Sequence, residues 1–477
     1  MAADLDLAYT PATELARLIR ARELSPVELM DNCLARIEAV NPVLNCFCFT
    51  YPDEARAAAR AAQAALASGA ALRPLHGIPI AIKDFTPTRG KITTRGSKAF
   101  EHWVPERDAL IVERLRAAGA IMVGKTTTPE FAYDSFTQSP LWGITRNPWD
   151  PGLTPGGSSG GAAAAVASGC VPLAEGSDMG GSVRIPAAFC GLVGLKPSLG
   201  RIPMDILPTV FDSISHFGPL ARTVADAALF LAVCQGPDER DIQSLTPALE
   251  MTLPPPGDVA GLKLGLSVDL GYYWVDPEVE ANTRAAAAAL AAAGAHVEEV
   301  ELGWSRAINE AWFAYWGVYL AACLGHVLED WRDEMDPNVV ALMEAGLAMG
   351  AVDFKRLEFV RTEHWQRLAA VFERVDALLC PTMALPPQPH GMSDSDYGHD
   401  CGHDCGHDDG RYHGLDMTSP FNFVAQCPAL SVPSGVTAAG LPTGLQIVGR
   451  RFDDPGVLGI GAALERRRPW AERRPPL

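Results

Sequence analysis

The chain is 477 residues long, carries a net charge of −18 and is 48% hydrophobic. This length exceeds one ordinary domain, but no long Ser/Gly/Pro linker divides the chain, so we expect a single large α/β domain over residues 1–477. The acidic balance, without a basic cluster, argues against nucleic acid and anionic membranes as partners. We therefore expect a small-molecule substrate and a monomer or homodimer.

The cysteines and the first residues indicate a reducing compartment. Eleven cysteines, an odd number, are scattered singly along the chain. Residues 1–6 contain acids where a secretory signal would have basic residues followed by an apolar run. We therefore expect a cytoplasmic protein.

Helical and strand patterns alternate along the N-terminal part of the chain, which is typical of a sheet covered by helices. Ser25, followed by Pro26 and then by Glu28, has the pattern of a helix N-cap and predicts a helix that runs toward Val40. Further helices are expected over residues 53–68, 108–118 and 162–168, and strands over residues 77–83 and 120–123.

The C-terminal part shows the same alternation. A proline cluster at residues 254–256 marks a boundary between segments rather than between domains. Strands are expected over residues 262–266, 296–302 and 376–380, and a helix over residues 277–293. The segment from about residue 304 to residue 374 has a helical, aromatic pattern in which we recognise no chemistry.

Two glycine-rich loops stand out, at residues 156–161 and 176–186, and the apolar run 162–174 joins them. Both loops contain serine. A serine nucleophile needs a base to take its proton and fixed N–H donors to hold the oxyanion that forms, and bare glycine backbone lets such donors approach a substrate. A glycine loop before a helix can also cradle phosphate, but no Walker lysine follows, which disfavours a nucleotide site.

Lys83 is the candidate base. No histidine lies in a compelling setting near the glycine loops, whereas Lys83 ends the apolar strand predicted over residues 77–83. Apolar surroundings disfavour the ammonium form, and a lysine with a lowered pKa can act as a general base. Taken alone, a lysine such as Lys83 is most often a solvated side chain. Its place after an apolar strand, together with the serine loops, makes serine chemistry with a lysine base plausible.

These features together resemble the amidase signature family. The resemblance rests on Lys83, on the segment 156–161 and on the long run 176–197. Shorter matches at residues 147–149 and 444–446 extend it over most of the chain. It implies a mixed, twisted central β-sheet flanked by α-helices on both faces.

The resemblance also implies roles for individual residues, with the catalytic core at residues 75–200. Ser182 would be the nucleophile that forms an acyl-enzyme, Ser158 the bridging serine on a cis peptide bond, and Lys83 the base. The backbone N–H groups of an oxyanion hole would come from Met179, Gly180, Gly181 and Ser182. Such a relay needs no cofactor and no metal.

Three neighbouring residues are expected to support the relay. Asp178 and Arg184 flank the nucleophile loop and could orient it as a buried ion pair. Ser159 either forms local hydrogen bonds or touches the relay. Glu175 has no assigned role; it either pairs with Arg184 or points to solvent.

Substrate choice is expected to reside in apolar residues near the nucleophile. Phe131 lies in a mostly apolar segment, and Ile206, Leu207 and Phe211 belong to the segment 202–211. This segment follows the signature closely enough to fold back over the nucleophile as an apolar wall. The alternative is that these side chains only fill the core. A wall of this kind favours a hydrophobic or aryl substrate.

Three functions remain open. The first is hydrolysis of C–N bonds in small amides, including aryl amides and carbamates (urethanes), or of esters. The second is the glutamine-hydrolysing subunit of a tRNA-dependent amidotransferase, which would need charged groups for the ammonium and carboxylate of glutamine. The third is a non-enzymatic scaffold, which the intact Lys83, Ser158 and Ser182 disfavour.

A tandem repeat of four-residue units, each beginning Gly-His-Asp, occupies residues 398–409. Its His, Cys and Asp side chains are ligand types for zinc or nickel. A glycine in every unit disfavours a helix, and the spacing does not resemble a closed zinc site with paired cysteines. Duplication within a surface loop over residues 398–414 is therefore the favoured interpretation.

We predict that this repeat is dispensable for the chemistry. Replacing residues 398–409 by a short Gly/Ser loop should leave the rate of amide hydrolysis within a few-fold, because loops on the surface tolerate replacement. Treatment of the unaltered protein with a chelator should have equally little effect. Loss of activity in the chelator, restored by zinc or nickel, would show the prediction to be wrong.

Overall fold

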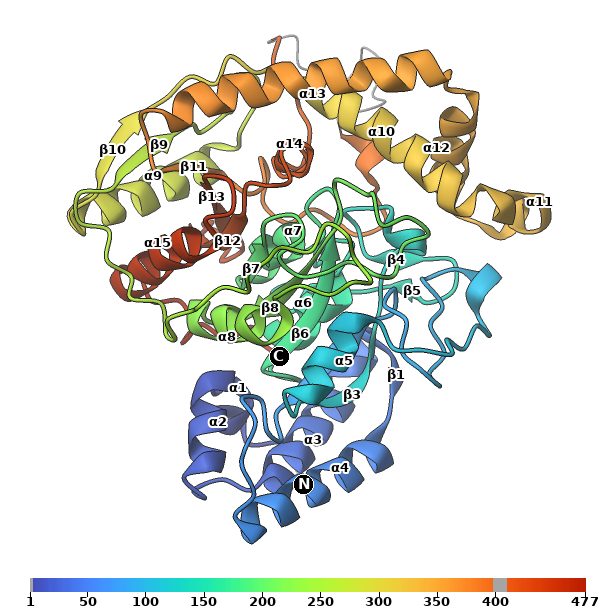
Figure 1. Ribbon diagram of the computed structural model, residues 1–477, viewed down its shortest axis with the longest axis vertical. Coiled ribbons are helices and arrows are strands. Elements are labelled where there is room, and N and C mark those ends of the chain that lie inside the picture. The colour runs from blue at the N-terminus through green and yellow to red at the C-terminus, as the bar shows by residue number, and fades with distance from the viewer. Residues whose placement is uncertain (1–2, 398–409) are drawn as a thin grey trace.

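A mixed sheet of eleven strands runs through the computed structural model, which describes residues 3–397 and 410–477 (Figure 1). In order across the sheet the strands are β1 (Phe47–Thr50), β3 (Ile121–Thr126), β2 (Pro79–Lys83), β6 (Leu173–Asp178), β8 (His216–Ala221), β7 (Val193–Lys196), β12 (Ala429–Val436), β13 (Pro442–Gly449), β11 (Ala377–Pro381), β9 (Lys263–Leu266) and β10 (His296–Glu299). β2 is parallel to β3 and β6, and β9 is parallel to β10 and β11. The other neighbours are antiparallel.

Helices surround this sheet. The α-helices of the described residues are α1 (Leu5–Tyr9), α2 (Ala12–Arg20), α3 (Pro26–Leu44), α4 (Pro52–Ser68), α5 (Leu110–Ala117), α6 (Gly160–Ala167), α7 (Arg184–Cys190), α8 (Val224–Cys234), α9 (Pro277–Ala292), α10 (Ala307–Leu324), α11 (Leu328–Trp331), α12 (Pro337–Ala348), α13 (Ala351–Phe372), α14 (Pro420–Phe423) and α15 (Asp454–Arg467). Short 3-10 helices are η1 (Lys98–Phe100), η2 (Glu130–Ala132), η3 (Gly325–Val327), η4 (Arg332–Glu334) and η5 (Asp394–Asp396). A separate pair of short strands consists of β4 (Gln138–Ser139) and β5 (Gly143–Ile144).

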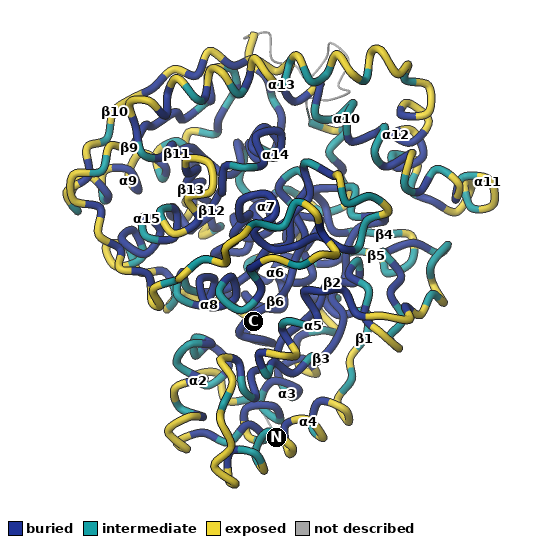
Figure 2. The backbone as a smooth tube through the Cα atoms, in the orientation of Figure 1, coloured by how far each residue is buried: buried dark blue, intermediate teal, exposed yellow. Residues whose placement is uncertain are grey.

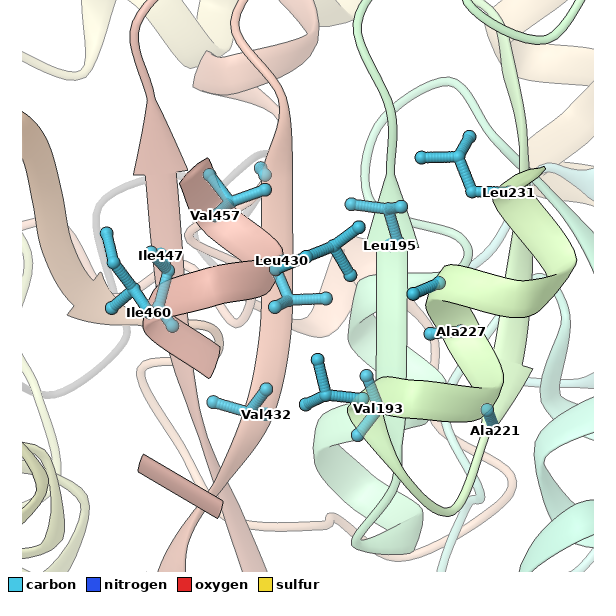
Figure 3. Close-up of a cluster of buried hydrophobic side chains, with 14 of the residues drawn as sticks. Val193, Leu195, Ala221, Ala227, Leu231, Leu430, Val432, Ile447, Val457 and Ile460 are labelled. Atoms are coloured by element: carbon cyan, nitrogen blue, oxygen red, sulfur yellow. The ribbon is translucent and has the colours of Figure 1, made fainter. Parts of the chain in front are cut away.

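The central strands are buried on both faces, as β2 illustrates. Ile80 and Ile82 belong to a core cluster that also contains side chains of α8 and α15, whereas Ala81 belongs to a second cluster with side chains of α3 and α6. Figure 3 shows part of the first cluster, where Leu195 of β7 and Leu430 of β12 face side chains of α8 and α15. Since alternate residues of a strand point to opposite faces, helices cover both faces of the sheet. The predicted single α/β domain is thus confirmed.

The local predictions hold to within a few residues. Ser25 caps α3, and its Oγ accepts a hydrogen bond of 3.1 Å from the N–H of Val27. α3 continues past the predicted end at Val40 to Leu44. The segment predicted as helical between residues 304 and 374 contains α10, α12 and α13, and α10 packs against the other two (Figure 1).

The stretch Ala307–Glu334, which begins with α10, is long and apolar enough to cross a bilayer by length and composition. Those two criteria are weak evidence for a membrane span, because core helices of globular domains also meet them. Trp316 and Leu320 of α10 are buried in a core cluster that also includes residues of α12.

The sheet topology brings Lys83 and the glycine-rich loop 176–186 together at the carboxyl ends of two adjacent strands. β2 and β6 are parallel, with Ile80 opposite Leu173, so Lys83 and Asp178 lie at the carboxyl ends of adjacent strands. The loop after Gly157 leads directly into α6, which is buried along its whole length (Figure 2). Small side chains let α6 pack closely against the strands: a Cβ on Gly161 would lie 2.4 Å from Thr127 Oγ1.

The predicted surface loop 398–414 is wrong at its C-terminal end. Residues 398–409 lie outside the described part of the chain. Tyr412 is only 7% exposed and forms a β-bridge with Tyr273. Its ring lies edge-on to that of Tyr273, with 5.1 Å between centroids, so the end of the predicted loop belongs to the core instead.

We predict that Gly161→Ala lowers the free energy of unfolding by about 1–3 kcal/mol, because the added methyl group overpacks the contact with Thr127. Gly459→Ala in α15 is the matched control, since a Cβ there meets nothing within 4 Å. The control should raise the free energy of unfolding by up to about 1 kcal/mol, the difference in helix propensity. Chemical denaturation measures both; equal effects of the two substitutions would contradict the packing argument.

Candidate active site

The two serine loops and the lysine strand converge in the structure. Lys83 Nζ lies 2.6 Å from Ser158 Oγ and 3.1 Å from Ser177 Oγ. Lys83 and Ser158 are fully buried. The peptide bond between Gly157 and Ser158 is cis, as the family resemblance implies. Ser158, Ser177 and Ser182 line one cavity, so the geometry gathers the lysine and the serines of both loops at a single place.

Burial changes the acidity of Lys83. Loss of water around the amine lowers its pKa to about 7, although the nearby carboxylates of Glu175 and Asp178 act in the opposite direction. The side-chain neighbours of the amine are hydroxyl groups rather than a carboxylate at contact distance. A substantial fraction of Lys83 is therefore a neutral amine near neutral pH, and a neutral amine can accept a proton.

Glu175 neither pairs with Arg184 nor points to solvent. It is fully buried at the middle of β6, where Oε2 accepts a hydrogen bond of 2.9 Å from the backbone N–H of Lys83. Oε1 accepts one of 2.8 Å from Thr86 Oγ1. Burial raises the pKa of this carboxyl. Glu175 thus anchors the backbone that carries Lys83, a contact between strands that the sequence pattern did not reveal.

The loop after β6 presents backbone N–H groups to the cavity. Its carbonyl oxygens are held: Met179 O accepts from Trp312 Nε1 at 3.1 Å, Gly180 O from Thr418 Oγ1 at 2.6 Å, and Gly181 O from the N–H of Ile185 at 2.7 Å. Within residues 3–397 and 410–477, no acceptor is found for the N–H groups of Met179, Gly180, Gly181 and Ser182. Fixed donors without internal partners are what an oxyanion requires.

Glycine is necessary at the two central positions of this loop. A Cβ on Gly180 would lie 2.4 Å from Trp312 Cζ2. A Cβ on Gly181 would lie 1.9 Å from Thr418 Oγ1, and Gly181 has a φ of +134°, which side-chain-bearing residues rarely adopt. Close contact with α10 and with the segment before α14 therefore fixes the loop.

Asp178 and Arg184 form the buried ion pair expected from the sequence. Both side chains are fully buried, and Arg184 donates to Asp178 at 2.9 Å from Nη2 and 3.0 Å from Nε. Arg184 also donates to Gln446 Oε1 of β13 and to Asn422 Oδ1 of α14. The guanidinium holds the pKa of Asp178 well below its usual range, against the opposing effect of burial. Through Arg184, the ion pair connects the loop 179–182 to β13 and α14.

Two other polar residues near the loop have local roles. Ser159 donates from its N–H to Ser182 O at 3.1 Å and from Oγ to Ser177 O at 3.4 Å, and it does not line the cavity. His216 is buried against Asp178 O, and burial lowers its pKa to about 3. His216 is therefore neutral, and it too is absent from the cavity wall as far as the described residues show.

Ser158 and Ser182 both line a cavity that is partly open to solvent. Aromatic and apolar side chains form part of its wall: Tyr133, Met179, Ile185, Trp312, Phe313 and Trp316. Three carboxyl side chains also line it: Asp134, Asp394 and Asp416. Trp312, Phe313 and Trp316 come from α10, in the segment where the sequence pattern showed no chemistry.

The predicted substrate pocket differs from this wall. Phe131 is fully buried and edge-on to Phe100, and it does not line the cavity, although its neighbours Ala132 and Tyr133 do. Ile206 and Leu207 pack against the main core cluster, and Phe211 is 74% exposed. The segment 202–211 is anchored elsewhere, since the N–H of Met204 donates to Asp241 and Asp205 accepts from Arg107. None of these four residues lines the cavity, so the substrate pocket predicted from the sequence does not match the cavity beside the serines.

Comparison with known proteins identifies the family. The family model "Amidase" matches residues 28–458. An acylamidase of Rhodococcus erythropolis is 39% identical, with 98% of each chain covered, and a glutamyl-tRNA(Gln) amidotransferase subunit of Chloroflexus aggregans is 38% identical, with 99% of each covered. The crystal structure of a bacterial aryl acylamidase of the amidase signature family superposes with a TM-score of 0.90 at 31% identity, with 97% of each chain covered.

The chain belongs to the amidase family, and its fold is that of amidase signature enzymes. It is an amide-hydrolysing enzyme, as this membership and the similarity to acylamidases indicate. The resemblance predicted from the sequence is confirmed, and the scaffold alternative is set aside.

We predict that Asp178→Asn lowers the free energy of unfolding by about 3–5 kcal/mol, because it leaves the buried Arg184 guanidinium without its carboxylate. Glu280→Gln in α9 is the control: it breaks an ion pair with Arg284 in which both side chains are nearly half exposed. That change should cost less than about 1 kcal/mol. Chemical denaturation compares the two, and similar small losses would contradict the structural role of the buried pair.

Proposed function

We propose that the protein hydrolyses small amides through an acyl-enzyme on Ser182, with Lys83 and Ser158 as the proton relay. The observation that carries the proposal is the contact of 2.6 Å between the buried Lys83 amine and Ser158 Oγ, in a cavity that Ser182 also lines. The family similarity supports amide hydrolysis in general. The assignment of the individual residues is ours.

In the proposed reaction, neutral Lys83 takes a proton from Ser158, which takes one from Ser182 as its oxygen attacks the amide carbon. The developing oxyanion accepts hydrogen bonds from the N–H groups of the loop 179–182. Collapse of the tetrahedral intermediate breaks the C–N bond, and the relay returns a proton to the leaving amine. Water then attacks the acyl-enzyme in the same way and releases the acid.

The cavity wall favours an aryl or hydrophobic amide. Trp312, Phe313 and Trp316 offer flat apolar surface beside the serines. The aryl acylamidase that superposes on this chain supports the same substrate class. Carbamates and esters, which react by the same acyl chemistry, belong to the proposal as secondary substrates.

Hydrolysis of glutamine within a tRNA-dependent amidotransferase is the second candidate, because the amidotransferase subunit of Chloroflexus aggregans is nearly as similar as the acylamidase. Free glutamine carries a carboxylate that needs a cationic partner. Among the described residues, neither lysine nor arginine lines the cavity. This distribution of charge favours the first candidate.

A substrate panel separates the two candidates. We expect the enzyme to hydrolyse an anilide faster, by kcat/KM, than an aliphatic amide, an aryl carbamate or glutamine, since the aromatic wall contacts the aryl group. Ser182→Ala should reduce the rate on every active substrate by several orders of magnitude. Turnover of glutamine alone would favour the amidotransferase, and a Ser182→Ala protein that keeps more than a few per cent of the rate would remove Ser182 as nucleophile.

The protonation of Lys83 predicts the pH dependence. With a pKa of about 7 and the neutral form active, kcat/KM should rise about tenfold per unit below pH 7 and level off above it. Lys83→Arg should lower kcat/KM by roughly 100-fold or more, because guanidinium stays protonated. Lys355→Arg, at an exposed position of α13, is the control and should have no effect. An active Lys83→Arg enzyme would contradict the role of Lys83 as base.

A further inference from the structure

Acidic side chains line the cavity beside the serines. Asp134 is only 4% exposed, Asp394 and Asp416 are half-buried, and all three side chains line the cavity. No lysine or arginine from residues 3–397 or 410–477 lines it. The amine of Lys83 is engaged with Ser158 and Ser177. Asp416 Oδ2 already accepts hydrogen bonds from Thr418 and Ser419, so Asp134 and Asp394 are the carboxyl groups for which a ligand is sought.

One of the two carboxyl oxygens of Asp134 has no hydrogen-bond partner among the described residues. Its Oδ1 accepts hydrogen bonds from the N–H groups of Phe136, at 3.0 Å, and Asp394, at 3.3 Å. Its Oδ2 is buried and has no hydrogen-bond partner within the described parts of the chain. A buried oxygen left in this way costs free energy, and a ligand that donates a hydrogen bond would recover it.

Asp394 places a second carboxyl beside Asp134. Its Oδ2 accepts hydrogen bonds from the N–H and the Oγ of Ser135, at 3.0 and 2.9 Å. Burial, together with the neighbouring carboxyl groups, raises the pKa of Asp134 well above its usual value and that of Asp394 to about 7. Burial is the largest cause of both pKa shifts, and repulsion adds to it, from Asp394 at Asp134 and from Asp416 at Asp394. A positive charge near these carboxyl groups would offset that repulsion.

Aromatic rings of the same cavity suit a cation as well. Trp312 and Trp316 of α10 are stacked, with 6.2 Å between ring centroids and 12° between planes. Trp312 is held in place by its hydrogen bond to Met179 O. The face of an indole ring attracts ammonium groups, and aromatic rings line known sites for organic ammonium ligands.

We propose that the cavity binds an amide whose acyl or amine part carries a protonated amino group, which donates hydrogen bonds to Asp134 and Asp394 beside the rings of Trp312 and Trp316. The inference rests on the proposed function, because Ser158 and Ser182 line the same cavity. It narrows the substrate class from aryl amides in general to amides that carry an ammonium group.

Binding to the Ser182→Ala protein tests the charge preference without turnover. Calorimetry with 3-phenylpropylammonium, 3-phenylpropanol and 3-phenylpropionate compares a cation, a neutral analogue and an anion of similar size. We expect the ammonium compound to bind at least about tenfold more tightly than the alcohol, and the carboxylate to bind most weakly. No binding of the cation, or equal binding of all three, would overturn the proposal.

Substitutions of single carboxyl groups show which residues cause the preference for the cation. Asp134→Asn keeps an oxygen for the N–H groups of Phe136 and Asp394 but removes the charge, and it should abolish the preference for the cation, as should Asp394→Asn. Asp396→Asn is the control, because Asp396 lies in the same short helix η5, has no part in the cavity wall and should keep the preference. A preference that survives in both Asp134→Asn and Asp394→Asn would overturn the assignment.

Turnover of matched amides separates this inference from the proposed function. The 4-(aminomethyl)benzoyl and 4-ethylbenzoyl anilides place the charge in the acyl part, and acetylated 4-(aminomethyl)aniline and 4-ethylaniline place it in the amine part. We expect the charged member of at least one pair to have a kcat/KM at least about tenfold higher. Hydrolysis without any preference for a charged member would overturn the inference and leave the proposed function standing. Binding of the cation without hydrolysis of any amide would overturn the proposed function and leave the charge preference standing.

Discussion

The burial of the Lys83 amine is the constraint on which the rest of the site depends. A lysine with no exposed surface at the end of a buried strand loses the hydration that keeps its ammonium form stable, and its pKa falls to about 7. Hydroxyl groups of Ser158 and Ser177 contact the amine, while Glu175 holds the backbone N–H rather than the amine itself. A carboxylate in direct contact with Nζ would raise the pKa and remove the base. Glu175 thus holds the backbone of β2 at Lys83 without a direct contact to the Lys83 amine.

The contacts that stabilise the fold also hold the backbone of the loop 179–182, to which the proposed chemistry belongs. The buried ion pair of Asp178 and Arg184 links the start of the loop to β13 and α14, and α10 reaches the same loop through Trp312. Held from these sides, the carbonyl groups of the loop are occupied and its N–H groups stay available. The rigid backbone that an oxyanion needs is therefore produced by contacts among segments far apart in the sequence. This arrangement explains why the glycines of the loop cannot be replaced without a clash.

The sequence was sufficient for the local elements and for the family, and it pointed to Lys83, Ser158 and Ser182, of which the structure places the Lys83 amine beside Ser158 and both serines at one cavity. Ser25 indicated a helix start, alternating patterns located β2 and β3, and the glycine loops with Lys83 indicated the family. The cavity wall was not predictable in this way, because it depends on which distant segments meet. Trp312 and Trp316 lie in a helix whose all-round apolar and aromatic pattern looks like packing, and Asp394 lies in an irregular segment. Leu207 and Phe211 follow the signature closely in sequence, yet their segment is anchored to Asp241 and Arg107, away from the cavity. Proximity along the chain was a poor guide to proximity in space.

The most direct test of this account is the pKa of the Lys83 amine itself. NMR of protein labelled at the lysine ε-carbon, with the Lys83 signal assigned by its absence in Lys83→Arg, would follow the titration of that amine alone. The account predicts a midpoint near pH 7, well separated from the signals of exposed lysines. A midpoint near 10.5, the ordinary value for lysine, would mean that the amine is charged throughout the working range and would contradict the proposed relay.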